Sequence, residues 1–173
     1  LDDRAVKPQH HILFLLALPS LAHLLHKKIC IHFRFHQEST CHQLKAIDIK
    51  TSSEVRIEGN VMWGYRPSRT SNGVAVTIHY GSRRISVTGN HIAHSHTGIA
   101  VHRGRINQRP HPLHPTDIVV SNNVIEGTAD SLPWGIRLGD IGPPLRVTNN
   151  RIIGHSQAVL TTKSLLRQVP SNP

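Results

Sequence analysis

The chain of 173 residues contains few aromatic side chains and only two cysteines. Phe, Trp and Tyr make up 4% of the residues, which excludes a core built from large rings and favours one filled by Ile, Val and Leu. Cys30 and Cys41 are too sparse for a disulfide scaffold and have no metal-ligand spacing, so they do not reveal the redox compartment. This length suits one domain with a sizeable core and disfavours two full domains.

Acidic residues are also scarce, with 10 Asp and Glu against 20 Lys and Arg, for a formal charge of +10. From Ala46 onward there are 14 basic and 7 acidic residues, a net charge of +7, so the excess is not confined to a tail. A positive field attracts polyanions, either nucleic acid or an acidic polysaccharide. Nucleic acid is disfavoured because stacking side chains are rare and no helix-turn-helix, RNA-recognition or zinc-finger pattern occurs. Solubility alone is the other explanation of the charge.

Residues 1–45 do not share the patterns of the rest of the chain. Residues 12–18, ILFLLAL, precede Pro-Ser-Leu-Ala and resemble the core of a signal peptide, although two Asp residues near the start are atypical of one. This signal-like segment, 12–22, favours a secreted or periplasmic protein. It is too short to cross a bilayer, and we expect no transmembrane segment. The basic, His-rich stretch that follows has neither a helical nor a strand period, which predicts an irregular N-terminal segment.

A repeat carries the main prediction. Residues 55–61, 85–92, 118–125 and 145–152 share one pattern: apolar, any, apolar, any, Gly or Asn, then Asn. The last position of the pattern is Asn60, Asn90, Asn123 and Asn150. An apolar strand precedes each unit, at 46–49, 74–76, 98–101 and 135–138, and a short third strand follows each Asn. Three short strands per unit with a period of two indicate a solenoid of stacked strands.

Stacking places equivalent residues of successive coils one strand spacing, about 4.8 Å, apart. Ile57, Val87, Val120 and Val147 would then form one aliphatic stack, and the preceding strands would supply another. The four asparagines would form an internal ladder, because an Asn amide can bond the equivalent amide one coil away. Gly59, Gly89, Asn122 and Asn149 precede them, and Gly and Asn accept the left-handed backbone of a tight bend.

These features predict an all-β fold, a right-handed single-stranded parallel β-helix of about four coils over residues 46–165, followed by a tail at 166–173. A β-sandwich would need hairpins between antiparallel neighbours, and a propeller would need four strands per blade. Neither explains an Asn at the same place in every unit. A leucine-rich solenoid would need a Leu-x-x-Leu-x-Leu frame, which is absent.

The I-x-V-x-G-N-x-I repeats resemble those of the right-handed parallel β-helix superfamily. That superfamily includes pectate-lyase-like enzymes, alginate-type lyases and uronan C5-epimerases, and the resemblance covers Ala46 to about Val159. It implies a secreted protein that cleaves or remodels an acidic polysaccharide in a groove along one sheet. The calcium-binding carboxylates and the catalytic Arg motif of pectate lyases have no match here, so calcium is unsupported and we expect no cofactor.

Polar residues at the ends of the strands before the first bend are the candidates for chemistry. β-Elimination on a uronate needs a cation for the carboxylate, a base for the adjacent proton and an acid for the leaving oxygen. We predict His79 or His102 as the base and Tyr80 as the acid. The candidates for substrate binding are Lys50, Arg103, Arg137, Trp63 and Trp134, with Arg favoured for its planar fork and Trp for packing on sugar rings.

Three further expectations accompany this assignment. His91, His94, His96 and His102 are close in sequence, but without converging ligands they favour polar surface, so we predict no metal site. The Pro-rich, basic insert that begins at Arg103 is typical of a loop at the wall of a groove. We expect a monomer. The alternative to an enzyme is a non-catalytic β-helix that binds carbohydrate or mediates adhesion, or an inactive fragment of a larger β-helix protein.

Overall fold

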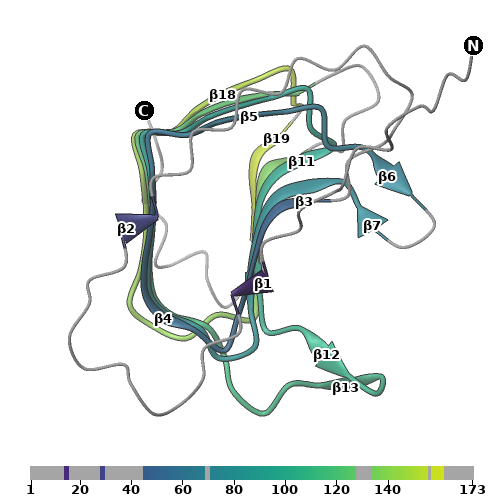
Figure 1. Ribbon diagram of the computed structural model, residues 1–173, viewed down its shortest axis with the longest axis vertical. Helices are drawn as coiled ribbons and strands as arrows, with labels where there is room; N and C mark the ends of the chain where they lie inside the picture. Colours follow the sequence, from purple (N-terminus) through teal and green to yellow (C-terminus); the bar gives the residue numbers. More distant parts are fainter. Residues whose placement is uncertain are drawn as a thin grey trace, which may run out of the picture.

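The computed structural model describes residues 14–15, 28–29, 45–68, 71–127, 134–155 and 157–161. They form an all-β parallel β-solenoid of about three turns, which confirms the predicted fold class (Figure 1). Three parallel sheets make its sides. Between the first and the last of the four ladder asparagines the chain winds round three times, so four aligned units correspond to about three turns. No helix that could cross a membrane occurs among these residues.

Four coils each contribute one strand to each of three sheets, in the order A, B, C, and the coils at the two ends of the solenoid are described only in part. Sheet A contains β1 (Phe14–Leu15), β3 (Lys45–Lys50), β8 (Val74–His79), β11 (Thr97–His102), β16 (Trp134–Gly139) and β19 (Gln157–Thr161). Sheet B contains β2 (Lys28–Ile29), β4 (Ser53–Glu58), β9 (Arg83–Thr88), β14 (Thr116–Ser121) and β17 (Leu145–Thr148). Sheet C contains β5 (Val61–Trp63), β10 (His91–Ala93), β15 (Val124–Glu126) and β18 (Arg151–Ile153).

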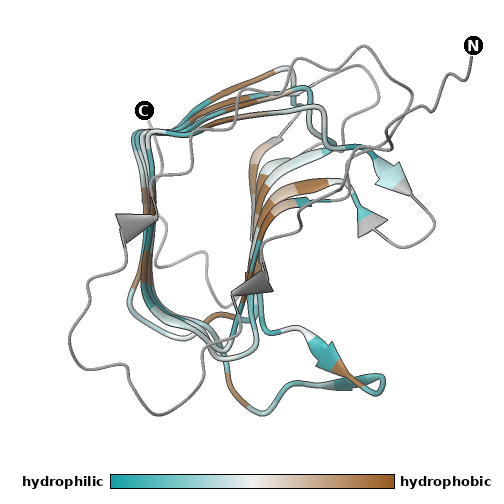
Figure 2. Cartoon of the chain, in the orientation of Figure 1, coloured by the Kyte–Doolittle hydropathy of each residue, from teal (hydrophilic) through white to brown (hydrophobic). Residues whose placement is uncertain are grey.

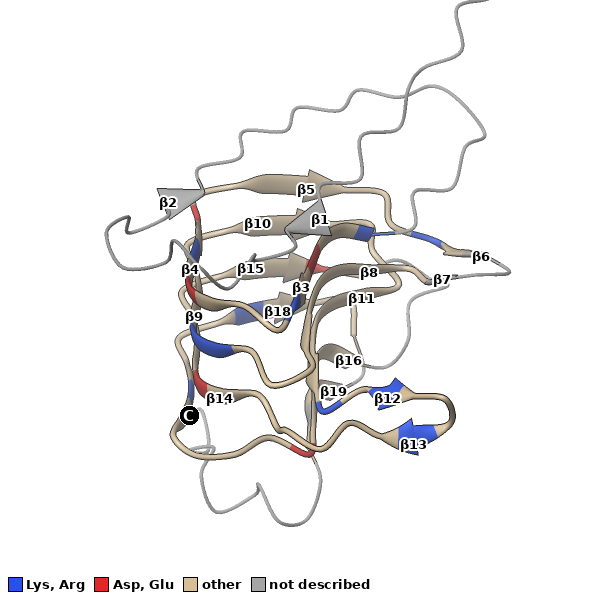
Figure 3. Cartoon of the chain, turned by 60° about the horizontal axis from the view of Figure 1, so that its bottom comes forward, with Lys and Arg blue, Asp and Glu red and all other residues tan. Residues whose placement is uncertain are grey.

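Two short antiparallel hairpins extend from the solenoid beside sheet A (Figure 1). One joins β6 (Pro67–Ser68) to β7 (Ser71–Asn72), and the other joins β12 (Arg105–Ile106) to β13 (Arg109–Pro110). Asn107 and Gln108 turn the second hairpin with φ of 49° and 67°, as two-residue hairpin loops with positive φ at both positions do. Part of the predicted wall loop is therefore a regular hairpin, and both of its strands carry an arginine (Figure 3).

The segment predicted to be irregular contributes two strands of two residues. β1 pairs in parallel with β3, and β2 pairs in parallel with β4. The rest of residues 1–44 lies outside the described residues, apart from these four positions. The same holds for both cysteines, for the signal-like segment except Phe14 and Leu15, and for the tail at 166–173.

The interior consists of aligned aliphatic side chains. Ile57, Val87, Val120 and Val147 are paired by register in sheet B, and all four are buried. Figure 2 shows the hydrophobic parts of successive coils lying over one another. Because each strand of four to six residues has only one apolar face, the strands bury that face by sharing one interior. The predicted stack is thus confirmed.

The asparagine ladder runs through this interior with a fixed direction. The backbone N–H and the Nδ2 of Asn60 both donate to Oδ1 of Asn90, at 3.0 and 2.9 Å. Asn90 donates in the same way to Asn123, at 3.0 and 2.9 Å, and Asn123 to Asn150, at 3.1 and 2.8 Å. Oδ1 of Asn60, at the N-terminal end of the ladder, is buried and accepts no hydrogen bond from the described residues. The predicted structural role of these asparagines is confirmed.

The residue before each ladder asparagine bends the chain out of sheet B. Gly59, Gly89, Asn122 and Asn149 have φ of 65°, 62°, 56° and 55°. Only Gly, and to a lesser degree Asn, adopts this left-handed conformation at low cost. The predicted bend is therefore present in all four coils.

At the corner where sheet C meets sheet A, two glycines let isoleucine side chains of sheet C pack directly against the backbone of sheet A. A Cβ at Gly98 would lie 2.5 Å from Cγ2 of Ile125, and a Cβ at Gly135 would lie 2.5 Å from Cγ2 of Ile152. In sheet A Ile99, the residue after Gly98, pairs with Ile136, the residue after Gly135, and in sheet C Ile125 pairs with Ile152. Each of these two coils therefore places an isoleucine directly against a glycine of the same coil.

Candidate functional site

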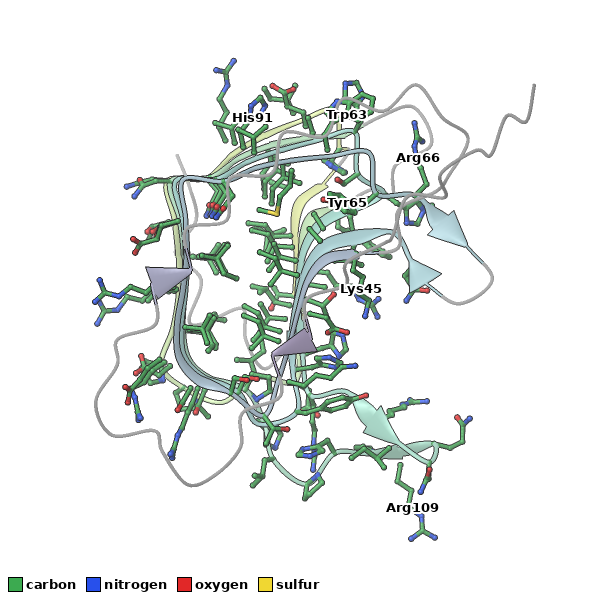
Figure 4. All side chains as sticks on the ribbon, in the orientation of Figure 1. Lys45, Trp63, Tyr65, Arg66, His91 and Arg109 are labelled. Carbon is green, nitrogen blue, oxygen red and sulfur yellow. The ribbon has the colours of Figure 1, made fainter. Side chains whose placement is uncertain are left out.

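The outer face of sheet A carries two polar columns. The register pairs Lys50 with His79 and His102 with Gly139, and it pairs Asp48 with Thr77 and Ala100 with Arg137. Because residues two apart along a strand share a face, both columns lie on one side of the sheet. In Figure 4 Lys45, on the first of these strands, projects from the side of sheet A that faces away from the interior.

A buried carboxylate and imidazole form the centre of this face. Nε2 of His79 lies 2.7 Å from Oδ1 of Asp48, and since an ionised carboxylate can only accept, Nε2 donates the proton. Lys45 and Lys50 each place Nζ 3.2 Å from Oδ2 of Asp48. Burial alone would raise the pKa of Asp48, but the bond from His79 and the charge of Lys45 outweigh burial and hold that pKa well below its usual range. Asp48 is therefore a carboxylate at neutral pH.

Tyr80 covers the imidazole of His79. The two rings stack with centroids 3.8 Å apart and an interplanar angle of 26°. The Tyr80 hydroxyl donates to the carbonyl of Arg105, at 3.1 Å, which ties the ring to the β12–β13 hairpin. A Cβ at Gly104 would lie 2.6 Å from Cδ1 of Tyr80 and 3.2 Å from Nδ1 of His79, so only a glycine lets the backbone pass this close. His79 is 5% exposed, and its Nδ1 has no hydrogen-bond partner in the part of the chain that the structure describes.

His102 is the more accessible of the two predicted bases. Its ring centroid lies 5.3 Å from that of His79, and its side chain is only partly buried. Burial, followed by the positive charges of its neighbours His79, Arg137 and Lys45, lowers the pKa of His102 to about 4. The imidazole is therefore neutral at pH 7 and able to accept a proton. His102 is favoured over His79 as a general base by its exposure, because the ring of His79 is buried and its Nε2 is bonded to Asp48.

The predicted substrate-binding cations have different environments. Arg103 places Nη1 3.3 Å from Oδ2 of Asp140, and its guanidinium also donates to the carbonyls of His111 and Pro112. Arg103 thereby holds the loop after the hairpin in place. Arg137 lies over the indole of Trp134, 5.8 Å from the ring centroid, and no carboxylate of the described residues forms an ion pair with it. Arg137 and Trp134 thus present a guanidinium beside an indole on the face that carries His102.

The five predicted binding residues do not all meet. Lys50 lies 5.8 Å from the Tyr80 ring centroid, so it belongs to the cluster around His79. Trp63 is on β5 of sheet C, a different side of the solenoid, and Figure 4 shows it projecting outward there. Trp63 lies on sheet C because it comes three residues after the ladder asparagine Asn60, in the third strand of its coil.

Two contributors to this site are not among the residues predicted from the sequence. The carboxylate of Asp48 accepts a hydrogen bond from His79 and forms ion pairs with Lys45 and Lys50. Gly104 was not considered, although its lack of a side chain permits the contact with Tyr80 and His79. The register of Asp48 and Lys50 against the next strand was the available signal for the first. No sequence signal pointed to the second.

The four histidines between 91 and 102 have separate neighbours. His91 lies 3.5 Å from Glu126, His94 contacts Trp63, and Nδ1 of His96 lies 3.0 Å from the carbonyl of Asn72. No group of three or more His, Cys, Asp or Glu side chains able to hold a metal ion occurs in the part of the chain that the structure describes.

In comparisons with known proteins, no family model, no curated protein and no solved structure matches this chain. The parallel β-solenoid is established by the strand register. The resemblance to a particular superfamily remains a prediction from the repeats.

Proposed function

We propose that the protein binds an acidic polysaccharide on the outer face of sheet A and acts on it by β-elimination or epimerisation. The observation that carries the proposal is the placement of Arg137, over Trp134 and on the same face as His102, without a carboxylate partner among the described residues. A guanidinium fork matches a carboxylate, and an indole packs against the apolar face of a sugar ring. Together the two side chains suit one uronate residue.

The chemistry follows from what lies beside that pair. With the uronate carboxylate on Arg137, the neutral His102 takes the proton from the carbon next to the carboxylate. In elimination the bond from the next carbon to the glycosidic oxygen breaks, a carbon–carbon double bond forms, and the leaving oxygen takes a proton from an acid, the role predicted for Tyr80. In epimerisation a proton returns to the same carbon from the opposite face. The rings of Tyr80 and His102 both lie against the imidazole of His79, which is bonded to the buried Asp48.

A non-catalytic binding protein is the second candidate, and one observation favours it. The proton of the Tyr80 hydroxyl is engaged with the Arg105 carbonyl, so Tyr80 must give up this bond to act as an acid. Without that change the same face binds an acidic chain but does not cleave it.

Binding and turnover assays separate these outcomes. Alginate, pectate and glycosaminoglycan oligosaccharides are titrated by calorimetry, and unsaturated product is followed by its ultraviolet absorbance. We expect Arg137→Ala to weaken binding about tenfold or more, because a charge-assisted bidentate pair contributes about 1.5–3 kcal/mol. Arg146→Ala is the matched control: it removes the same exposed charge from sheet B and is expected to leave binding unchanged.

His102→Gln tests the reaction itself. We expect it to abolish product while the oligosaccharide still binds. Binding without product in the parent protein would establish the non-catalytic candidate. If no acidic oligosaccharide binds, or if Arg146→Ala weakens binding as much as Arg137→Ala, the proposal is wrong.

A further inference from the structure

The outer face of sheet C exposes hydrophobic side chains that the site on sheet A does not use. Val61 is 48% exposed, Trp63 46% and Ile153 40%, and all three belong to β5 or β18. Figure 4 shows Trp63 and His91 projecting from this side of the solenoid. Val61 and Trp63 lie together on β5 at one edge of the sheet, whereas Ile153 lies on β18 at the other edge, so the exposed hydrophobic area that could form a binding surface is centred on β5.

The register gives this face a definite shape. Trp63 pairs with Ala93, and Ala93 pairs with Glu126. Neighbouring strands lie about 4.8 Å apart, so the indole and the carboxylate stand two strand spacings from each other with only a methyl group between them. We call Trp63, His91, Ala93, His94 and Glu126 the Trp63 surface.

Neighbouring histidines contact both Trp63 and Glu126. The ring of His94 meets the indole of Trp63 edge to face, with centroids 5.0 Å apart and an interplanar angle of 67°. Nε2 of His91 lies 3.5 Å from Oε2 of Glu126. Contacts of this kind reduce the rotamer freedom that a ligand would otherwise have to remove on binding.

The size of the face argues for a small ligand. It is four strands wide and two outward residues deep, which corresponds to an area on the order of 200 Å². A stable protein interface buries about 800 Å² per partner, several times more. A single oligosaccharide chain fits such a narrow strip, whereas a folded partner would have to extend well beyond it.

The chemistry of the surface selects the kind of sugar. An indole face packs against the C–H groups of a pyranose ring, and a carboxylate accepts hydrogen bonds from sugar hydroxyls. The same carboxylate repels a uronate. We propose that the Trp63 surface is a second carbohydrate-binding site, separate from sheet A, which takes a neutral sugar chain with one ring packed on the exposed indole of Trp63 and the chain running across the sheet towards Glu126.

Tryptophan fluorescence can isolate this site because the chain has only two tryptophans. In a Trp134→Phe background the emission reports on Trp63 alone. We expect hexasaccharides of β-linked glucose, mannose and xylose to be titrated to about 10 mM, above the ~1 mM Kd of a weak sugar site, and at least one to change the emission saturably. Trp63→Ala, measured by calorimetry, is expected to weaken its binding about tenfold. Ile153→Ala, at the far edge of the same sheet, is the matched control and is expected to have little effect.

Glu126→Gln tests the selectivity. We expect a galacturonate hexasaccharide to leave Trp63 emission unchanged in the Trp134→Phe protein and to change it once Glu126 is also Gln. The inference is overturned if no neutral hexasaccharide changes the emission, if Trp63→Ala binds as tightly as the parent, or if the galacturonate chain binds the Trp63 surface equally well with Glu126 present. These results do not bear on the acidic polysaccharide proposed for sheet A, which is assayed through Arg137.

Discussion

Because every hydrogen bond of the asparagine ladder runs in the same direction, its members are expected to contribute unequally to stability. A pair of substitutions tests this. Asn90→Ala removes an acceptor that serves both the backbone N–H and the Nδ2 of Asn60, and a donor that serves the carbonyl of Ile57. Asn60→Ala removes no used acceptor, since Oδ1 of Asn60 has no donor. The interior asparagine is therefore expected to matter far more than the terminal one.

The expected magnitudes follow from the buried groups that each change leaves without a partner. Such a group costs about 1–3 kcal/mol. Asn90→Ala leaves two of them, the Asn60 N–H and the Ile57 carbonyl, and it also weakens the bonding of Asn60 Nδ2, for a loss of roughly 3–5 kcal/mol. Asn60→Ala deprives the part-buried Glu58 carbonyl of its side-chain donor and leaves Oδ1 of Asn90 with one of its two donors, so its loss is expected near the lower end of that range, about 1 kcal/mol.

Urea unfolding followed by far-ultraviolet circular dichroism measures both values. With a slope of about 2 kcal/mol per molar urea, a loss of 3 kcal/mol lowers the midpoint by about 1.5 M. Asn90→Leu separates hydrogen bonding from packing, because it fills the volume without restoring any bond, and it is expected to destabilise as Asn90→Ala does. Equal midpoints for Asn60→Ala and Asn90→Ala, or a Leu variant as stable as the parent, would refute the reasoning.

Three further expectations rest on single contacts. Gly104→Ala is expected to lower stability by about 2 kcal/mol or more, since its Cβ would overlap Tyr80, whereas Gly89→Ala meets no atom within 4 Å and is expected to lose only about 1 kcal/mol through its positive φ; equal losses in thermal unfolding would contradict this. The pKa of His102 is lowered to about 4 in the folded chain, so the unfolded chain binds the extra proton and stability is expected to fall by on the order of 1–2 kcal/mol as pH drops from about 6.5 to 4; His102→Gln should flatten that part of the urea-midpoint profile, and an unchanged slope would count against the assignment. Val120→Ala, in the middle of the aliphatic stack, is expected to lose roughly 2–3 kcal/mol by urea unfolding, and a loss below about 1 kcal/mol would show that the stack repacks.

The features that repeat in every coil were the ones that the sequence predicted. Ile57 and its equivalents, and the ladder asparagines, recur at the same place because stacking puts equivalent residues in contact, so one unit reports on the others. The bends at Gly59 and Gly89 were predicted for the same reason. Repetition is thus a strong signal for the interior of a solenoid.

Features that occur once gave no such signal. The stacking of Tyr80 on His79 depends on the path of the chain through Gly104, and the hairpin after it belongs to a single coil. The burial of His79 likewise depends on side chains from three different segments. Strands of two residues, such as β1 and β2, are too short to show a period. The candidate site could therefore be placed on a sheet from the sequence, but its internal contacts could not.

The pairing of Gly98 with Ile125, and of Gly135 with Ile152, bears on how this chain can change over time. Ile125→Val would not relieve Gly98→Ala, because valine keeps the Cγ2 atom that the new Cβ would meet at 2.5 Å, whereas Ile125→Ala removes that atom. A Cβ at Gly98 would also lie 2.8 Å from the carbonyl oxygen of Gly135 in the next coil. A turn with a larger residue at this corner could therefore be duplicated or exchanged only together with a change in the neighbouring turn.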